Sequence, residues 1–176
     1  MSNKEIKEYD KNNNLVYYKG SFGLEFWYKY DKNSNLIHKK NSNGFEVWKE
    51  FDKNNNLIHY KNSFGLEAWK EYDKNNNLIH FKNSFGLEAW REYDKNNNLI
   101  YYKDSSGYEY WREYDENNNL IHSKYPDGIE YWYKYNKNNK RIEINKQEFK
   151  QIERRKEKRE LYLNNKKINR FELMDI

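Results

Sequence analysis

The sequence predicts a mainly β fold, a single antiparallel β-meander or solenoid of about 12–13 strands that is curved and carries a C-terminal α-helical cap. The first observation is a period, because Tyr or Phe recurs every 21 residues from Tyr9 to Tyr135. The second is that six glycines, from Gly23 to Gly128, and all six tryptophans keep that period. The third is that no insertion interrupts the array, so each repeat is expected to have the same structural role.

The residues of one repeat predict two strands and two turns. Leu66–Tyr72 and Leu78–Lys82 are rich in residues that favour strands. Asp73–Asn77 is the first turn, in which asparagine tolerates left-handed backbone, and Asn83–Gly86 is the second, with glycine supplying a positive φ. Turns at both ends predict a continuous meander. Twelve strands at about 4.8 Å would span nearly 60 Å, and open sheets that wide usually curl.

A register follows from requiring each face of the sheet to be consistent. A first turn of five residues pairs Leu78 with Tyr72, and a second turn of two or four residues pairs Ile79 with Trp90. With this register the tryptophans share a face with the glutamates, Ile79 and Phe81. The other face would carry the tyrosines, the histidines and most lysines and arginines. We therefore expect one acidic, aromatic face and one basic face.

The C-terminal residues are predicted to end the array. Arg141–Ile144 is typical of a last strand, Asn145 of a helix N-cap, and the residues from Lys146 to about Leu161 of a helix that caps the open end. Residues 161–176 would add a strand or an irregular extension. The predicted division is a repeat array over residues 1–144 and a basic helical tail over residues 145–176. Residues 137–176 contain 13 Lys/Arg against 7 Asp/Glu, so the tail carries the excess positive charge.

The composition excludes several classes of protein. A mean hydropathy of −1.43 alone suggests disorder, but an aromatic content of 19% in fixed columns favours a folded sheet. The absence of cysteine excludes disulfides and thiol chemistry. No apolar run approaches the roughly 18 residues of a membrane helix, and the N-terminus lacks a secretory apolar region. We therefore expect a cytoplasmic protein that has no membrane partner.

The repeat resembles the YD repeats of RHS proteins over about residues 8–136. The resemblance lies in the motif Tyr72-Asp73-Lys74-Asn75-Asn76-Asn77-Leu78, followed by Gly86 and by Tyr93-Asp94. Asn76 stands where the family usually has glycine, and the tryptophan column is not a general family feature. Large RHS proteins use many such repeats to wind a β shell around a toxin. The resemblance therefore implies an architecture, and the six repeats found here are too few to imply a closed shell.

No catalytic, cofactor or metal site is predicted. The histidines His38, His59, His80 and His122 form a column whose members lie two strands apart, about 9–10 Å, so neighbours cannot share one zinc ion. The glutamate columns repeat too regularly to form one acid–base pair. We therefore predict that the protein is not an enzyme and has no cofactor.

The long repetitive surface favours a binding function. The candidate partner-binding residues are Trp27, Trp48, Trp69, Trp90, Trp111, Trp132, Lys61, Lys82, Lys103, Arg91, Arg112, Arg154, Arg155, Lys158 and Arg159. The leading hypothesis is a protein partner, such as a nucleic-acid enzyme inhibited in the manner of a phage anti-defence protein. One alternative is a carbohydrate-binding module that uses the Trp and Tyr columns. The other is nucleic-acid binding through the basic face and tail. The unpaired first strand also leaves a homodimer open.

Overall fold

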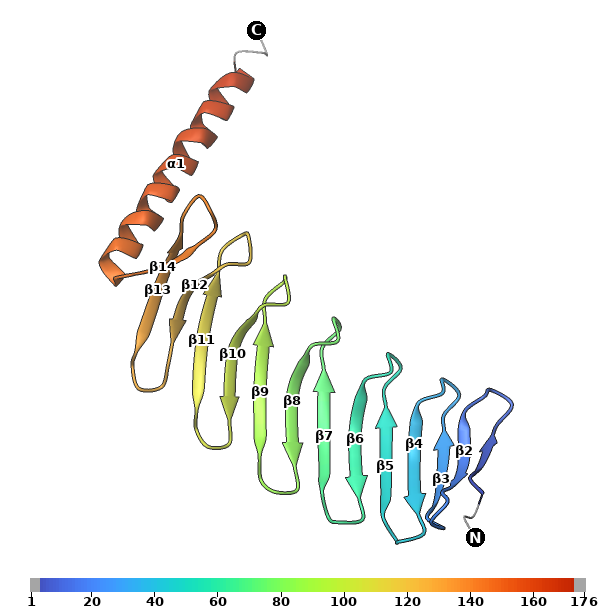
Figure 1. Ribbon diagram of the computed structural model, residues 1–176. Coiled ribbons are helices and arrows are strands. Elements are labelled where there is room, and N and C mark those ends of the chain that lie inside the picture. Colours follow the sequence, from blue (N-terminus) through green and yellow to red (C-terminus); the bar gives the residue numbers. More distant parts are fainter. Residues whose placement is uncertain (1–3, 173–176) are drawn as a thin grey trace. The chain divides into compact units, whose positions relative to one another are not determined.

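The computed structural model describes residues 4–172, with side chains through residue 162. Fourteen strands follow one another in one antiparallel sheet in the order of the chain, and a helix follows them (Figure 1). The elements are β1 (Ile6–Tyr9), β2 (Leu15–Lys19), β3 (Glu25–Tyr30), β4 (Leu36–Asn41), β5 (Glu46–Phe51), β6 (Leu57–Asn62), β7 (Glu67–Tyr72), β8 (Leu78–Asn83), β9 (Glu88–Tyr93), β10 (Leu99–Asp104), β11 (Glu109–Tyr114), β12 (Leu120–Lys124), β13 (Glu130–Tyr135), β14 (Arg141–Ile144) and α1 (Lys146–Glu172). The predicted single antiparallel sheet is confirmed. It has one strand more than the upper expected number because β1, which precedes the first complete repeat, already pairs with β2.

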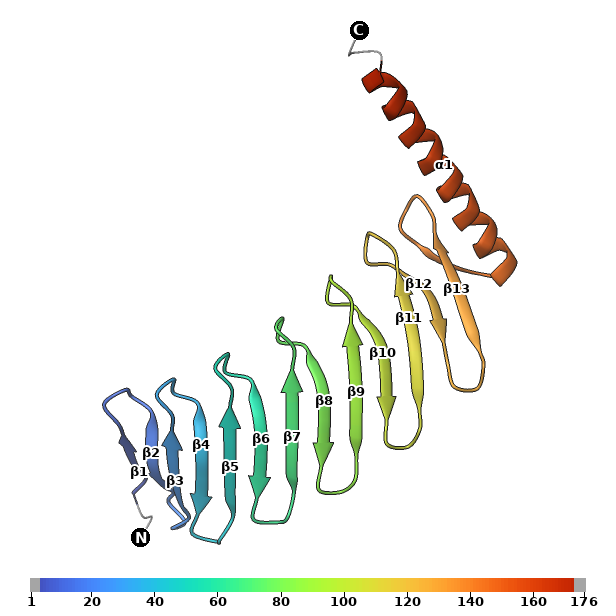
Figure 2. The same ribbon diagram turned by 180° about the vertical axis from the view of Figure 1, so that it is seen from behind.

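The chain forms two compact units, Met1–Glu109 and Tyr110–Ile176. In the first unit the strands from β1 to β10 lie side by side, as both views show (Figures 1 and 2). Within residues 4–109 this sheet has no second layer. Its two faces are therefore formed only by side chains of the sheet itself. The second unit holds most of β11, the strands β12–β14 and α1.

The turn that follows each Tyr-Asp pair spans five residues, as predicted. The N–H of Asp73 donates to the carbonyl of Asn77 over 2.9 Å, and the N–H of Asn76 donates to the carbonyl of Asp73 over 3.1 Å. Asn76 is left-handed, with a φ of 65°. The Asp73 carboxylate also accepts the side-chain amide of Asn77 at 3.0 Å. This is a type I turn followed by a left-handed residue, a common short hairpin connection.

The second turn of each repeat has the same geometry. The N–H of Asn83 donates to the carbonyl of Leu87 over 2.9 Å, and the N–H of Gly86 donates to the carbonyl of Asn83 over 3.2 Å. Gly86 has a φ of 85°, a conformation that favours glycine. The turn therefore closes over residues 83–87, and the predicted length of two or four residues is wrong. The first pair beyond the turn is Lys82 with Glu88.

The strand after the asparagine-rich turn differs from the predicted register by one residue. Glu71 pairs with His80, which leaves Ile79 as the extra residue of a β-bulge. On the opposite side of this strand it is His80, and not Ile79, that pairs with Trp90. Phe81 consequently lies on the face opposite to Trp90. The prediction is wrong here because a shift of one residue moves every side chain of a strand to the other face.

The observed register defines two faces, which we call the Trp face and the Tyr face. On strands β6–β9 the Trp face carries His59, Lys61, Glu67, Trp69, Glu71, His80, Lys82, Glu88, Trp90 and Glu92. On the same strands the Tyr face carries Tyr60, Ala68, Lys70, Tyr72, Phe81, Ala89, Arg91 and Tyr93. The predicted separation into an acidic and a basic face is therefore wrong for the lysine column of Lys61 and Lys82, which lies among the glutamates.

The few buried side chains of the first unit are small residues on the Tyr face. Val47, Ala68 and Ala89 are 8%, 9% and 2% exposed. In a sheet without a second layer, a short side chain is covered by the longer ones beside it. Ala68, for example, lies between its cross-strand partners Tyr60 and Asn83. These small side chains are thus covered by aromatic and amide side chains of the neighbouring strands.

Asparagine side chains join successive turns along one edge of the sheet. The Oδ1 atom of Asn76 accepts hydrogen bonds from the side-chain amides of Asn54 at 3.0 Å and Asn56 at 2.8 Å, both in the preceding repeat. Asn55 and Asn97 accept the same two bonds from the repeats before them. Glycine could adopt the left-handed backbone but has no side chain to accept these bonds. The ladder gives a physical reason for asparagine at the position where the resembling family has glycine.

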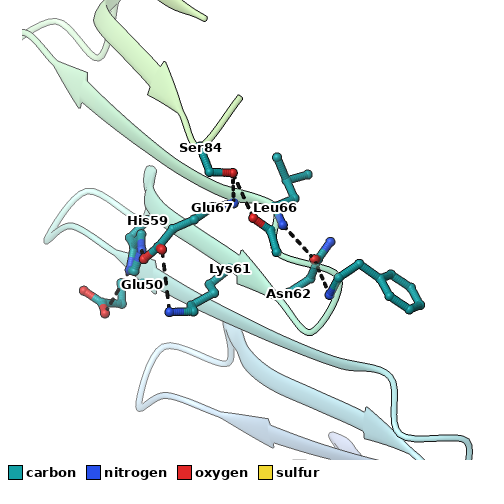
Figure 3. A network of polar contacts seen from close by, with 9 residues as sticks. Glu50, His59, Lys61, Asn62, Leu66, Glu67 and Ser84 are labelled. Atoms are coloured by element: carbon teal, nitrogen blue, oxygen red, sulfur yellow. Dashed lines mark hydrogen bonds and ion pairs between the residues drawn. The ribbon is translucent and has the colours of Figure 1, made fainter. Parts of the chain in front are cut away.

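Serine joins the turns along the other edge. The N–H of Ser84 donates to the carbonyl of Glu67 over 2.7 Å, and its Oγ accepts the N–H of Glu67 at 3.0 Å (Figure 3). The same hydroxyl donates to the carbonyl of Gly65 at 2.9 Å. Ser42, Ser63 and Ser105 make the same backbone bond to their preceding repeats.

The C-terminal helix is longer than predicted. Asn145 is its N-cap, as expected, because its Oδ1 accepts the N–H of Glu148 at 2.9 Å. The helix continues to Glu172, and the predicted strand or irregular extension is wrong for Leu161–Glu172. No Gly or Pro occurs in this segment to end a helix. Residues 173–176 lie outside the described residues.

Candidate functional site

Trp69 of the Trp face packs between side chains of the two neighbouring strands. His59 stacks on Trp69 with ring centroids 5.4 Å apart, and the Nζ of Lys82 lies 5.1 Å from the Trp69 ring. Stacking of this kind recurs at Trp48, Trp90 and Trp132. The rings are therefore packed by histidine and lysine, and not by Ile79 and Phe81 as the predicted register implied.

The histidines bridge pairs of glutamates. The Nδ1 of His59 lies 3.2 Å from Glu50 and its Nε2 lies 2.9 Å from Glu67 (Figure 3). His80 makes the same two contacts with Glu71 and Glu88, at 3.2 and 2.8 Å. Burial alone would lower the pKa of His80, but hydrogen bonds and charges of the two carboxylates raise it above its usual value. This column orders the Trp face by polar contacts that run across the strands.

The glutamates divide into two rows with different surroundings. In the first row Glu67 contacts both His59 and Lys61, and its side chain is 26% exposed. In the row of Glu50 and Glu71, each side chain is 68% exposed and contacts only the Nδ1 of its histidine. The second row is thus the accessible acidic feature of the Trp face. Within the described residues no group of three His, Asp or Glu side chains has the arrangement to hold a metal ion.

The structure distributes the candidate partner-binding residues over three places. Lys61, Lys82 and Lys103 lie on the Trp face, where each pairs with a tryptophan across the strands. Arg91 lies on the Tyr face, with its guanidinium 5.3 Å from the ring of Tyr102.

In the second unit Arg112 likewise lies on the Tyr face, over the ring of Tyr110 at 4.4 Å. The basic residues of the tail, which are Arg154, Arg155, Lys158 and Arg159, are exposed on α1. The structure therefore does not bring the predicted lysines and arginines together into one basic face.

The helix α1 covers the Trp face of β13. Lys146 lies 5.1 Å from the ring of Trp132 and its Nζ contacts Glu130 at 3.4 Å. Lys134 of the strand contacts Glu148 of the helix at 2.6 Å.

Phe149 adds a ring contact to the same surface. Its centroid lies 6.5 Å from that of His122, which itself stacks on the tryptophan of β13. The Trp, His and Glu columns of this unit thus accept a helix that offers one aromatic ring and alternating charges.

Exposed phenylalanines were not among the predicted site residues. Phe22, Phe64 and Phe85 occupy the tips of glycine turns and are 101%, 79% and 73% exposed. A turn position ordinarily filled by a polar residue but occupied three times by Phe is a signal that the sequence offers. These rings lie at the edge of the sheet formed by the glycine turns.

Among the comparisons with known proteins, those with solved structures found similar proteins. No family model matches the chain, and no curated protein matches it. No helix within the described residues combines the length and apolar character needed to span a membrane.

Solved structures of toxin components with RHS-type repeats are similar to this chain. A structure of TcdB2-TccC3 matches with 14% identity and a TM-score of 0.56, over 75% of this chain and 9% of that chain. The Tc holotoxin pore of Photorhabdus luminescens matches with 12% identity and a TM-score of 0.52, over 79% and 10%. TcdB2-TccC3-Cdc42 matches with 14% identity and a TM-score of 0.50, over the same shares. This chain spans about a tenth of the length of those chains, and it shares with them the fold of a repeating antiparallel β sheet.

Proposed function

We propose that this chain is a non-catalytic binding protein, built from repeats of the YD type, that holds a protein partner on the Trp face of residues 4–109. The observation that carries the proposal is the packing of α1 against the Trp face of β13. There the same columns of Trp, His and Glu already accept a helix within the chain. In the first unit these columns recur without a second layer, and Trp48 and Trp90 are 39% and 38% exposed.

The charge of the Trp face indicates what the partner would carry. Lys134 contacts the acidic Glu148 of α1. At the same position of the repeat the first unit has Glu50, Glu71 and Glu92, besides Lys29. A segment with acidic residues at that place would be repelled, whereas Lys or Arg would find an accessible carboxylate. The row repeats every second strand, about 9.6 Å, and residues seven positions apart on a helix are about 10.5 Å apart. A helix with Lys or Arg at every seventh position fits this row.

The geometry favours a protein partner over the two alternatives. Sugar rings stack on an open aromatic face, but Trp69 has His59 on its ring and Lys82 over it. A phosphate backbone needs uncompensated cations, but Lys61 of this face lies 3.6 Å from Glu67. The exposed edges of the rings and the exposed glutamates remain available to a protein surface.

The test is affinity capture from the source cells with and without nuclease, using three forms of the full chain. The first is the wild type. The second replaces Glu50, Glu71 and Glu92 by Lys, a residue that the same column already carries at Lys29 and Lys134. The third, the matched control, is Lys70→Gln on the Tyr face.

We expect one defined protein to be captured whether or not nuclease is added. It should bind the control as tightly as the wild type, and the triple variant at least tenfold more weakly. Direct titration of the identified protein would measure that ratio. Recovery of nucleic acid alone, lost on digestion, would overturn the proposal. So would a protein that binds all three forms equally.

A further inference from the structure

In the first unit, one column of aromatic rings on the Tyr face is interrupted at a single position. At the position of Tyr18, Tyr60, Phe81 and Tyr102, the second repeat has Lys39. Lys39 pairs with Tyr28 on one side and with Val47 on the other, and its Nζ lies 4.9 Å from the ring of Phe26. A flexible side chain that lies toward one neighbour thus stands where the other repeats of the first unit have an aromatic ring.

A pocket of about 270 Å³ lies beside this lysine. Val47, 8% exposed, belongs to its lining, together with Leu36, Phe45 and Tyr60. Lys39, Lys49 and His38 complete the lining, and none of the lining residues is acidic. The volume is just below the range of about 300–1,000 Å³ typical of small-molecule pockets.

The two ammonium groups have no carboxylate partner within the described residues. On the Trp face, by contrast, Lys19 contacts Glu25 at 2.6 Å and Lys61 contacts Glu67 at 3.6 Å. The difference follows from the register, because every carboxylate of strands β1–β9 lies on the Trp face. Lys39 and Lys49 therefore present positive charge beside apolar and aromatic walls without a counter-charge on their own face.

We propose that this pocket binds the phosphate of a nucleotide, with the base against the aromatic wall of Phe45 and Tyr60. Lysine provides compact point charges that suit the several oxygens of a phosphate, whereas planar carboxylates are matched best by arginine. Aromatic rings beside a cationic groove stack bases of any sequence. The nucleotide is either free or part of a single strand. This site lies on the opposite face from the surface proposed for a protein partner, and it does not depend on that proposal.

The experiment titrates the full chain with adenosine 5′-monophosphate, adenosine, inorganic phosphate and a six-residue oligodeoxyadenylate, followed by amide chemical shifts and calorimetry. Lys39→Tyr is the main variant, because it restores the residue that three other repeats carry and should therefore fold. Lys49→Gln removes the second charge. Lys70→Gln is the control, since Lys70 has the place of Lys49 in the next repeat but does not line the pocket.

We expect saturable binding of the monophosphate, with shifts centred on Val47 and Lys49. Lys39→Tyr and Lys49→Gln should each weaken it at least tenfold and Lys70→Gln less than twofold, while adenosine should bind at least tenfold more weakly than its monophosphate. Oligonucleotide binding that is tighter than that of the monophosphate, and is weakened by Lys70→Gln as well, would identify a single strand as the source. Equal or weaker oligonucleotide binding would identify a free nucleotide.

Three results would overturn the proposal. One is the absence of saturable binding by any of the phosphate-bearing probes. Another is unchanged binding by Lys39→Tyr when circular dichroism shows that the variant is folded. The last is equal affinity for adenosine and its monophosphate. Because the triple glutamate variant of the Trp face leaves this pocket intact, it should bind the monophosphate like the wild type, which separates this test from that of the protein partner.

Discussion

The asparagine ladder allows one prediction to be worked through in detail at Asn76. This residue combines a left-handed backbone, with a φ of 65°, and two accepted hydrogen bonds from Asn54 and Asn56. Three substitutions separate these contributions. Asn76→Asp keeps the acceptor oxygen and a short side chain that tolerates this backbone, Asn76→Gly keeps only the backbone freedom, and Asn76→Ala keeps neither.

The magnitudes follow from the contacts. A hydrogen bond contributes about 0.5–1.5 kcal/mol net, and these two are exposed, so their loss in Asn76→Gly should cost about 1–2 kcal/mol. Relief of backbone strain by glycine is offset by its greater freedom in the unfolded chain. Asn76→Ala should lose a further ~1–2 kcal/mol for the left-handed residue. Asn76→Asp should stay within about 0.5 kcal/mol of the wild type.

The assay is equilibrium unfolding in urea followed by tryptophan fluorescence, with fits that allow partial unfolding of a repeat array. The expected order of the free energy of unfolding is wild type and Asn76→Asp, then Asn76→Gly, then Asn76→Ala. If Asn76→Gly is as stable as the wild type while Asn76→Ala is not, only the backbone conformation matters. In that case the ladder contributes nothing, and our explanation of asparagine at this position is refuted.

Gly86, His80 and Asp73 allow three further tests. A Cβ at Gly86 would meet no atom within 4 Å, so Gly86→Ala should lose only about 1–2 kcal/mol in urea unfolding, the cost of a left-handed residue; a loss above about 3 kcal/mol would contradict this. The pKa of His80 is raised in the folded protein, so its contribution to stability is complete below pH 6.5 and is lost as the pH rises through the folded pKa. NMR titration of His80 and the pH dependence of unfolding of His80→Gln should show this. Identical pH dependence of the variant and the wild type would count against it. Hydrogen bonds from Asn77 lower the pKa of Asp73 below 3.8, so the contribution of Asp73 to stability is present above that pH and is lost as the pH falls through the folded pKa. Asp73→Asn should therefore weaken the dependence of unfolding on acid. An unchanged dependence would refute the assignment.

The sequence was sufficient to predict the repeats, the strands and the first turn, because each rests on local preferences written many times. The N-cap at Asn145 is of the same kind. The register was not predictable by the same reasoning. Leu78 and Ile79 are both apolar, so alternation does not show which of them belongs to the bulge.

One signal in the sequence could have corrected the register. Both turns have Asp or Asn at their first position and a left-handed residue, Asn76 or Gly86, three positions later. Equal patterns predict equal turn lengths, and a five-residue second turn pairs Lys82 with Glu88 directly. The order of the charges on the two faces would then have followed.

The candidate sites were predicted only in part. The tryptophan and lysine columns were identified, but their assignment to faces depended on the register. The pocket beside Lys39 could not be predicted, since it depends on the position of the Lys39 side chain near the ring of Phe26 and on the small size of Val47. The helix on the Trp face of β13 depends on contacts between residues distant in the chain, such as Lys134 with Glu148.

The bonds between successive turns have a consequence for how such a chain can change. In the central repeats, each repeat offers the preceding one the same asparagine oxygen at one edge and the same serine contacts at the other, as at Asn76 and Ser84. Duplication or deletion of one of these central repeats would therefore recreate the same junctions without a new turn. Because each of these central repeats also brings one tryptophan and one exposed glutamate, a single genetic event could alter the valency of the binding surface, and with it the avidity for an extended partner.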